Sequence, residues 1–167
     1  MKTGQNSSLQ AHMAAYRSEL QKGSIQLAYR GLMDFMSALR TRMKATYPEA
    51  FISGSLYYGV MDMTYFSIIP QDLKARGLKI AVVFLHEAFC FEVWLSGANR
   101  QIQVETWKLL KERGYARYRL AIDPARGDSI LEQTLTAEPN FDDPQALTAL
   151  LEGGVADFIR AVQADLG

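Results

Sequence analysis

The sequence predicts one α+β domain over residues 1–167, with a mainly antiparallel sheet of four to five strands around a central hairpin, packed by N- and C-terminal helices. Two observations predict this class. Apolar residues recur at helical spacing toward both ends of the chain, and short apolar runs separated by turn residues fill its middle. Hydrophobic residues make up 49% of the chain and charged residues 22%, which favours a folded domain over a disordered one.

Residues 79–97 are predicted to form the central hairpin. Residues 80–85 are all apolar and residues 89–95 are interrupted only by Glu92, a pattern typical of interior strands covered on both faces. The reversal lacks the glycine or asparagine of a two-residue turn, so we expect a four-residue turn over residues 86–89. One face of the hairpin is then wholly apolar. The other face has the pairs Leu85 with Cys90, Val83 with Glu92, Ala81 with Trp94 and Lys79 with Ser96.

Two helices are expected before the sheet. The first begins at a cap formed by Ser7 or Ser8 and ends at Gly23. The second ends before Pro48, because the residue preceding a proline avoids the helical region. The apolar side of the first helix holds Leu9, Met13, Tyr16 and Leu20, and that of the second holds Ala28, Leu32, Phe35, Met36, Leu39 and Met43.

A long strand is expected between these helices and the hairpin. Residues 56–69 include three tyrosines together with threonine, valine and phenylalanine, residue types that favour strands, and Gly59 is a candidate bulge. Pro70 ends the strand, and the polar residues 71–77 connect it to the hairpin.

After the hairpin, Asn99 is placed to cap a helix that runs to Arg113 and stops at Gly114. Residues 116–122 are predicted to be a strand, because their apolar side chains alternate with arginines. Residues 128–137 fit either a strand or a short helix, and we favour the strand.

The C-terminal segment is predicted to form two helices. Asp143 caps the first of them and Pro144 occupies its first turn. Gly153 and Gly154 are expected to break it, so that a second, amphipathic helix follows to the end of the chain.

The residues suited to metal binding or catalysis are few and scattered. The two histidines, His12 and His86, lie far apart, and Cys90 is the single cysteine, so no metal site is predicted. No phosphate-binding loop, dinucleotide-binding glycine pattern or nucleophile elbow is present, so no cofactor is predicted. We interpret Cys90 as a small buried residue in a reducing cytoplasm.

Two carboxylates stand among apolar residues, Asp62 in the predicted strand 56–69 and Glu92 in the second hairpin strand. Such a carboxylate either has a partner or a raised pKa, and both occur at functional sites. The structural alternatives are an ion pair or a strand edge open to water. The candidate ligand-binding residues are these two acids and the aromatic residues near them: Asp62, Glu92, Trp94, Tyr58 and Tyr65, with Tyr57 in the same strand.

Glu92 is expected to lack a basic partner, because no lysine or arginine lies near Val83 in the adjoining strand. On that basis a neutral residue at this position is predicted to leave stability unchanged or to raise it.

Charge is unevenly distributed along the chain although the net charge is zero. Residues 1–126 hold 17 Lys+Arg against 10 Asp+Glu, and residues 127–167 hold 1 against 8. A basic body can bind nucleic acid, but we favour the alternative that the acidic C-terminal segment packs beside the basic elements. No apolar stretch reaches the ~18 residues of a membrane span, and the first ten residues lack an apolar signal core, so neither membrane association nor export is expected.

The predicted element order from Ser24 onward, helix, three strands, helix, strand, resembles the core of PD-(D/E)xK nucleases. That resemblance implies an acid at the start of the second core strand and an E-x-K sequence in the third. Here the second strand begins Lys79-Ile80-Ala81 and the third has Glu92-Val93-Trp94, without the lysine. An active nuclease of this type is not expected.

The blocks GSLYYGVMDMTYF, LKIAVVFLHEAFCFEVWLSG and QVETWKLLKERG resemble an uncharacterised bacterial family of small single-domain proteins. The resemblance covers most of the chain from about Tyr16 onward, with the central block the most specific. It implies a compact, bacterial, cytoplasmic protein and identifies no catalytic residue.

We therefore expect a non-enzymatic cytoplasmic domain that binds a ligand or a protein, with self-association as one form of that interaction. The alternative is a nucleic-acid-related protein of nuclease-like topology.

Overall fold

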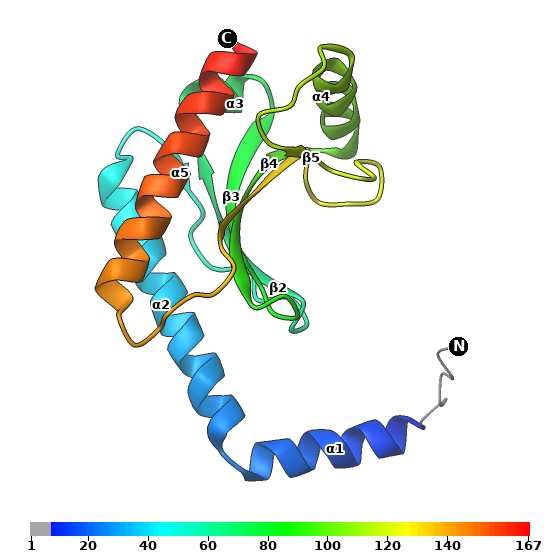
Figure 1. Ribbon diagram of the computed structural model, residues 1–167, viewed down its shortest axis with the longest axis vertical. Helices are drawn as coiled ribbons and strands as arrows, with labels where there is room; N and C mark the ends of the chain where they lie inside the picture. Colours follow the sequence, from blue (N-terminus) through cyan, green and yellow to red (C-terminus); the bar gives the residue numbers. More distant parts are fainter. Residues whose placement is uncertain (1–7) are drawn as a thin grey trace. The chain divides into compact units, whose positions relative to one another are not determined.

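The computed structural model describes residues 8–167 (Figure 1). The chain divides into two compact units, Met1–Met36 and Ser37–Gly167. No helix among the described residues is both long enough and apolar enough to cross a membrane.

The first unit contains α1 (Leu9–Gln21) and the start of α2 (Ser24–Thr46). Ser8 caps α1 by accepting a hydrogen bond from the backbone N–H of Ala11, which confirms one of the two predicted caps; Ser7 lies outside the described residues. Gly23 separates the two helices as predicted, with a φ of 78° that few residues other than glycine adopt.

The second unit contains an antiparallel sheet of six strands in the order β1-β2-β3-β4-β6-β5. The fold class is therefore confirmed as α+β, with one strand more than the four or five predicted. The strands are β1 (Phe51–Ile52), β2 (Met63–Ile69), β3 (Leu78–Leu85), β4 (Cys90–Gly97), β5 (Arg119–Leu120) and β6 (Leu131–Thr136). The additional strand is β1, whose two residues are too few to produce a periodic pattern.

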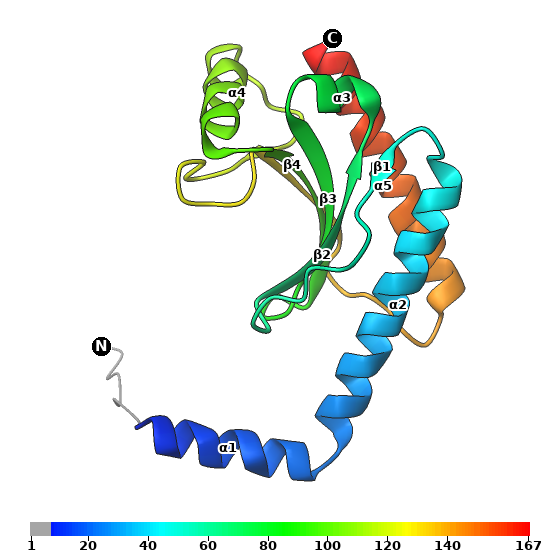
Figure 2. The same ribbon diagram turned by 180° about the vertical axis from the view of Figure 1, so that it is seen from behind.

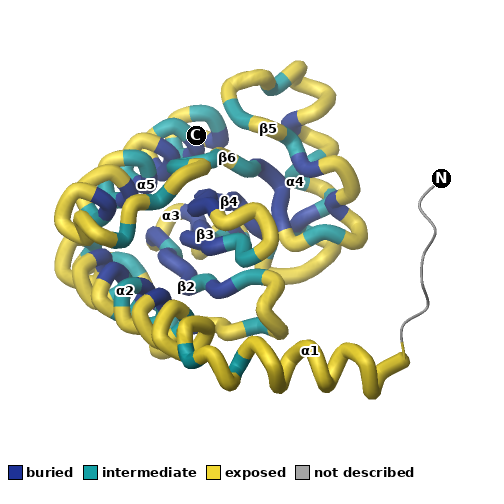
Figure 3. Tube along the Cα trace, turned by 60° about the horizontal axis from the view of Figure 1, so that its bottom comes forward, coloured by how far each residue is buried: buried dark blue, intermediate teal, exposed yellow. Residues whose placement is uncertain are grey.

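The central hairpin is confirmed in its turn and in its register. A four-residue turn over residues 86–89 joins β3 to β4, and Phe84 pairs with Phe91, Val83 with Glu92. Phe89 takes the left-handed conformation in this turn, with φ of 53°. Buried residues are concentrated in β3 and β4, at the centre of the sheet (Figure 3).

The long strand predicted over residues 56–69 is wrong in its first half. Only β2 is a regular strand, and the preceding residues fold back so that Tyr57 pairs with Tyr65 in an isolated bridge. Gly59 forms a turn with φ of 65° rather than a bulge, and Asp62 Oδ1 accepts a hydrogen bond from the N–H of Val60. This local hydrogen bond competes with strand pairing, so the regular strand begins only at Met63.

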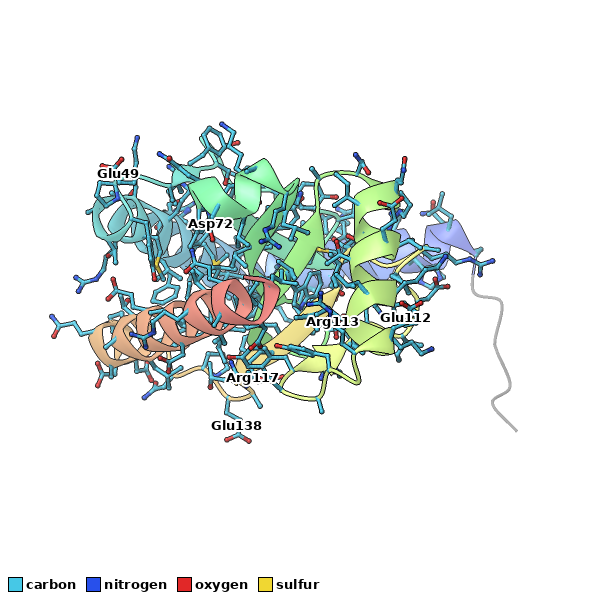
Figure 4. All side chains as sticks on the ribbon, turned by 90° about the horizontal axis from the view of Figure 1, so that it is seen from above. Glu49, Asp72, Glu112, Arg113, Arg117 and Glu138 are labelled. Atoms are coloured by element: carbon cyan, nitrogen blue, oxygen red, sulfur yellow. The ribbon has the colours of Figure 1, made fainter. Side chains whose placement is uncertain are left out.

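The connection after Pro70 is a short helix, α3 (Gln71–Ala75), rather than an irregular polar segment. Its Asp72, labelled in Figure 4, accepts a hydrogen bond from Gln163 at 3.0 Å.

Most of the segment 116–122, predicted to be a strand, is irregular. Only its two residues in β5 pair with a neighbouring strand, which is β6. Tyr118 packs on Phe158, but Ile122 is 99% exposed, so the alternation of apolar residues does not mark a buried face. The strand favoured over residues 128–137 is confirmed as β6.

Helix α4 (Arg100–Glu112) is confirmed, with Asn99 accepting a hydrogen bond from the N–H of Ile102. Helix α5 (Pro144–Leu166) begins at the Asp143 cap as predicted.

The predicted break at Gly153-Gly154 is wrong, because α5 is continuous. Each helical glycine costs about 1 kcal/mol, which the burial of the apolar side of α5 offsets. The buried residues are Leu147, Leu151, Val155, Phe158, Ile159, Val162 and Leu166.

The helices of the second unit lie on both sides of the sheet. Helix α5 lies along one side, next to the C-terminal half of α2, and Arg42 there pairs with Glu152 (Figures 1 and 2). Helix α4 lies on the other side, at one end of β4. We call that side the second face; its central residues are Met63, Tyr65, Ala81, Val83, Leu85 and Trp94.

Candidate ligand-binding site

The second face contains a cavity of about 290 Å³. Strand residues Tyr65, Ala81 and Trp94 line it from the sheet, and Tyr57 lines it from the loop before β2. The turn after β4 and the first turn of α4 line it from the helix side. The volume lies at the lower end of the range for small-molecule sites.

Small side chains in the sheet leave space for this cavity. Ala81 lies between Ser67 of β2 and Trp94 of β4 in register, so the row has one large side chain and two small ones. The next row along the strands places Tyr65 beside Val83. The hollow at Ala81 is therefore flanked by aromatic rings.

Gly97 allows α4 to begin close against the end of β4. A Cβ at this position would lie 2.6 Å from the backbone nitrogen of Gln103. That distance is too short for any residue with a side chain. The N–H of Gly97 donates to Oε1 of Gln103 at 3.2 Å, so the close approach is also hydrogen-bonded. The first turn of α4 is thereby fixed at the edge of the cavity.

The aromatic wall consists of Tyr57 and Tyr65, whose rings stack with centroids 4.9 Å apart and planes at 29°. Two backbone hydrogen bonds of 2.8 and 3.1 Å hold the pair together. Burial raises the pKa of Tyr65, and Tyr57 and the Asp128 carboxylate add to the shift. The Tyr65 phenol therefore stays protonated near neutral pH and can donate a hydrogen bond.

Two side chains of opposite charge, Lys79 and Asp128, also line the cavity. Lys79 is half-buried on β3, opposite Ser96 of β4. The Ser96 hydroxyl donates to the backbone carbonyl of Asp128 at 2.6 Å. Ser96 therefore lies opposite Lys79 and also binds the backbone of Asp128.

Helix α4 also holds the loop that leads to Asp128. Gln103 is buried and donates to the carbonyls of Pro124 and Gly127 at 3.0 and 2.8 Å. Arg100 donates to the same two carbonyls, with the Pro124 bond at 3.1 Å. The position of Asp128 is thus set by side chains more than twenty residues away.

The family model described as Domain of unknown function (DUF7000) matches residues 9–166, nearly the whole chain. The chain belongs to the DUF7000 family. No curated protein and no solved structure matches it. The resemblance to an uncharacterised family is therefore confirmed.

In this DUF7000 chain the structure brings together only part of the predicted site. Tyr65, Glu92 and Trp94 lie on the second face, where Tyr65 and Trp94 line the cavity. Tyr58 is exposed in the loop before β2, outside the cavity. Asp62 lies in the same loop, where backbone N–H groups bind its carboxylate, and neither Asp62 nor Glu92 lines the cavity.

The expectation that Glu92 lacks a basic partner is wrong, so the prediction that a neutral residue there leaves stability unchanged or raises it loses its basis. Its Oε1 lies 3.1 Å from Nη2 of Arg119 and accepts a hydrogen bond from Thr134 at 3.2 Å. Its Oε2 accepts a hydrogen bond from the Trp94 indole at 2.6 Å. Arg119 comes from β5, on the far side of β6, and also pairs with Glu132. The expectation failed because it considered only β3, the strand on the other side of Glu92.

The other reactive groups considered in the sequence do not form a metal centre. Among residues 8–167 no group of three or more His, Cys, Asp or Glu side chains is placed to hold a metal ion. Cys90 is buried, and burial raises the pKa of its thiol, which disfavours the reactive thiolate.

Sequence reasoning missed Lys79 and Asp128 as site residues. Lys79 could have been predicted as a site residue, because the predicted register places it on the same face as Ala81 and Trp94. Asp128 had no such signal, since it lies in a loop whose position depends on Gln103 and Arg100.

Proposed function

We propose that this protein is a non-enzymatic ligand-binding domain of the bacterial cytoplasm and that the cavity on the second face is its binding site. The observation that carries the proposal is the composition of the cavity. A half-buried lysine without an ion-pair partner among the described residues lines the same hollow as the Tyr57–Tyr65 pair and Trp94. Apolar walls with a few polar groups are typical of small-molecule sites.

A binding role is favoured over catalysis by the residue types in the cavity. The described lining residues include no histidine and no cysteine, the types most often used as general base and as activated nucleophile. Glu92 and Glu132, which lie beside Trp94 in the sheet, are both bound to Arg119, so Asp128 is the one carboxylate among the described lining residues. The groups left for a ligand are hydrogen-bond donors, charges and rings.

A cavity-filling variant tests the proposal. We expect that a ligand from a broad set of small metabolites raises the melting temperature of the parent and not that of Ala81→Leu, whose larger side chain occupies the hollow. At a concentration of 100 Kd, binding adds ~2.7 kcal/mol to the unfolding free energy, a shift of several degrees. Ala45→Leu, at an exposed position of α2, is the matched control and should retain the response.

The proposal fails if no compound shifts the melting of the parent, or if Ala81→Leu responds as the parent does. Lys79→Met provides a second arm should Ala81→Leu fold poorly, because it removes a charge from the cavity without adding volume. An unchanged response to every ligand in Lys79→Met would also contradict the proposal.

A further inference from the structure

Lys79 and Asp128 differ from the other charges on the second face in having neither an ion pair nor a side-chain hydrogen bond among the described residues, whereas Arg100, the third charged residue of the cavity lining, donates to the carbonyls of Pro124 and Gly127. Glu92, Arg119 and Glu132 form a mutually paired cluster. Lys79 and Asp128 appear in none of the ion pairs formed by the described residues. A lysine and a carboxylate that line one hollow without an ion pair are both available to a ligand.

The backbones of both residues are held in place by the fold. The backbone of Lys79 is part of a central strand, paired on one side with Ser96. Asp128 is tethered through its own carbonyl by Ser96, and Gln103 binds the carbonyl of the residue before it. Such preorganisation lowers the entropic cost of binding a ligand that carries complementary charges.

The remaining lining determines the size and character of the ligand. A volume of about 290 Å³ lies at the lower end of the range for small-molecule sites, which favours a small ligand. The small side chain of Ala81 leaves the hollow open, and the rings of Tyr65 and Trp94 line it with apolar surface. A ligand with one apolar group fits this part.

We propose that the cavity takes a small zwitterion of the size of a free amino acid with an apolar side chain. The ligand's carboxylate faces Lys79, its ammonium group faces Asp128, and its side chain packs against Tyr65 and Trp94. This inference rests on the proposed function and narrows its ligand to one chemical class.

Titration calorimetry with three matched probes tests the inference. The probes are L-phenylalanine, 3-phenylpropionate, which lacks the ammonium group, and phenethylamine, which lacks the carboxylate. We expect L-phenylalanine to bind about ten- to hundredfold more tightly than either of the others, the range for one hydrogen-bonded charge. The dipeptide Phe-Phe, whose charges lie farther apart, distinguishes a free amino acid from a peptide and should bind more weakly than L-phenylalanine.

Two variants assign the charges. Lys79→Met should weaken L-phenylalanine and 3-phenylpropionate and leave phenethylamine unchanged. Asp128→Asn should weaken L-phenylalanine and phenethylamine and leave 3-phenylpropionate unchanged. Lys108→Met and Asp142→Asn, at exposed positions outside the cavity, are the controls and should bind all three probes as the parent does.

The inference is overturned if L-phenylalanine binds no better than the singly charged probes, if none of the three binds, or if the two variants lose the same probes. These results leave the proposed function in place whenever another compound shifts the melting of the parent and not that of Ala81→Leu. The proposed function fails separately, when no such compound exists.

Discussion

Glu92 is a charged residue in the middle of a sheet, only 6% exposed, whose carboxylate is fully engaged by its surroundings. An indole N–H, a hydroxyl and a guanidinium bind its two oxygens. Because the Arg119 side chain is 56% exposed, water screens that ion pair and reduces its contribution to stability. The buried bond from Trp94 is the interaction most costly to lose, since an indole N–H without an acceptor is penalised in the interior.

We predict that Glu92→Leu lowers the unfolding free energy by about 1–3 kcal/mol and that Glu92→Gln lowers it by less, because the amide oxygen can still accept the Trp94 bond. Urea unfolding of both variants measures the difference. In a Trp94→Phe background the indole donor is absent, so Glu92→Leu should cost less there. Equal losses for Gln and Leu in the parent would show that the indole bond is unimportant.

Asp62 is predicted to make stability depend on pH in the acid range. Hydrogen bonds from the backbone N–H groups of Val60 and Met63 hold the pKa of Asp62 below its ordinary value of 3.8. The unfolded chain therefore binds a proton first as the pH falls. The contribution of Asp62 to stability is complete above the unfolded pKa and is lost as the pH falls through the folded pKa.

The measurement compares urea unfolding of the parent and Asp62→Ala between about pH 7 and about pH 2.5. The stability difference between the two proteins should be constant down to about pH 5 and should shrink below about pH 4. Asp142→Ala, in another exposed loop, controls for the general effect of removing an acid. A difference that is constant over the whole range would contradict the assigned role.

Helix α5 shows how packing overrides local preference within one element. Gly153 is exposed, and a Cβ there would meet no atom within 4 Å. Gly154 faces the sheet, where a Cβ would lie 2.5 Å from Cδ2 of Leu135. The second glycine therefore permits close contact between α5 and β6, whereas the first has no such packing role.

We predict that Gly153→Ala raises the unfolding free energy by about 1 kcal/mol, the propensity difference in a helix interior. Gly154→Ala should gain less or lose stability, because its methyl group must displace the Leu135 side chain. Thermal unfolding of the two single variants measures the contrast. If both alanines stabilise equally, the contact with Leu135 does not restrict this position.

At the scale of the whole molecule, the uneven charge along the chain is partly neutralised by ion pairs within the second unit. Arg42 pairs with Glu152 at 2.7 Å and Arg119 with Glu132 at 2.7 Å. Arg117, labelled in Figure 4, lies 3.3 Å from Asp165. Each of these pairs joins a basic residue before position 127 to an acidic residue after it. This arrangement favours internal neutralisation over a nucleic-acid surface.

We predict no saturable binding of a labelled single- or double-stranded oligonucleotide at about 150 mM salt, and no cleavage of plasmid with magnesium or manganese. Fluorescence anisotropy at two salt concentrations measures the binding. The triple variant Glu132→Gln, Glu152→Gln, Asp165→Asn frees Arg42 and Arg117, leaves Arg119 with Glu92 alone, and should bind more tightly at low salt, as a positive control. Tight, salt-sensitive binding by the parent, or cleavage abolished by Glu92→Ala, would restore the nuclease-like alternative.

The central hairpin and the starts of α1, α4 and α5 were predictable from the sequence because their causes are local. Continuous apolar runs around one polar turn permit a single favourable register of β3 with β4. Ser8, Asn99 and Asp143 each cap a helix through a side chain three residues from its partner.

The candidate site was predictable in Tyr57, Tyr65 and Trp94 and, through the hairpin register, in Lys79, whereas the rest of it depends on which segments become neighbours. Strand β6 lies between β4 and β5, an order that places Arg119 within reach of Glu92 although 27 residues separate them. The same tertiary packing brings Asp128 to the cavity through Ser96, 32 residues earlier in the chain. Local patterns determine strands, turns and caps, whereas contacts between distant segments follow from the burial of whole faces, which no single stretch of sequence encodes.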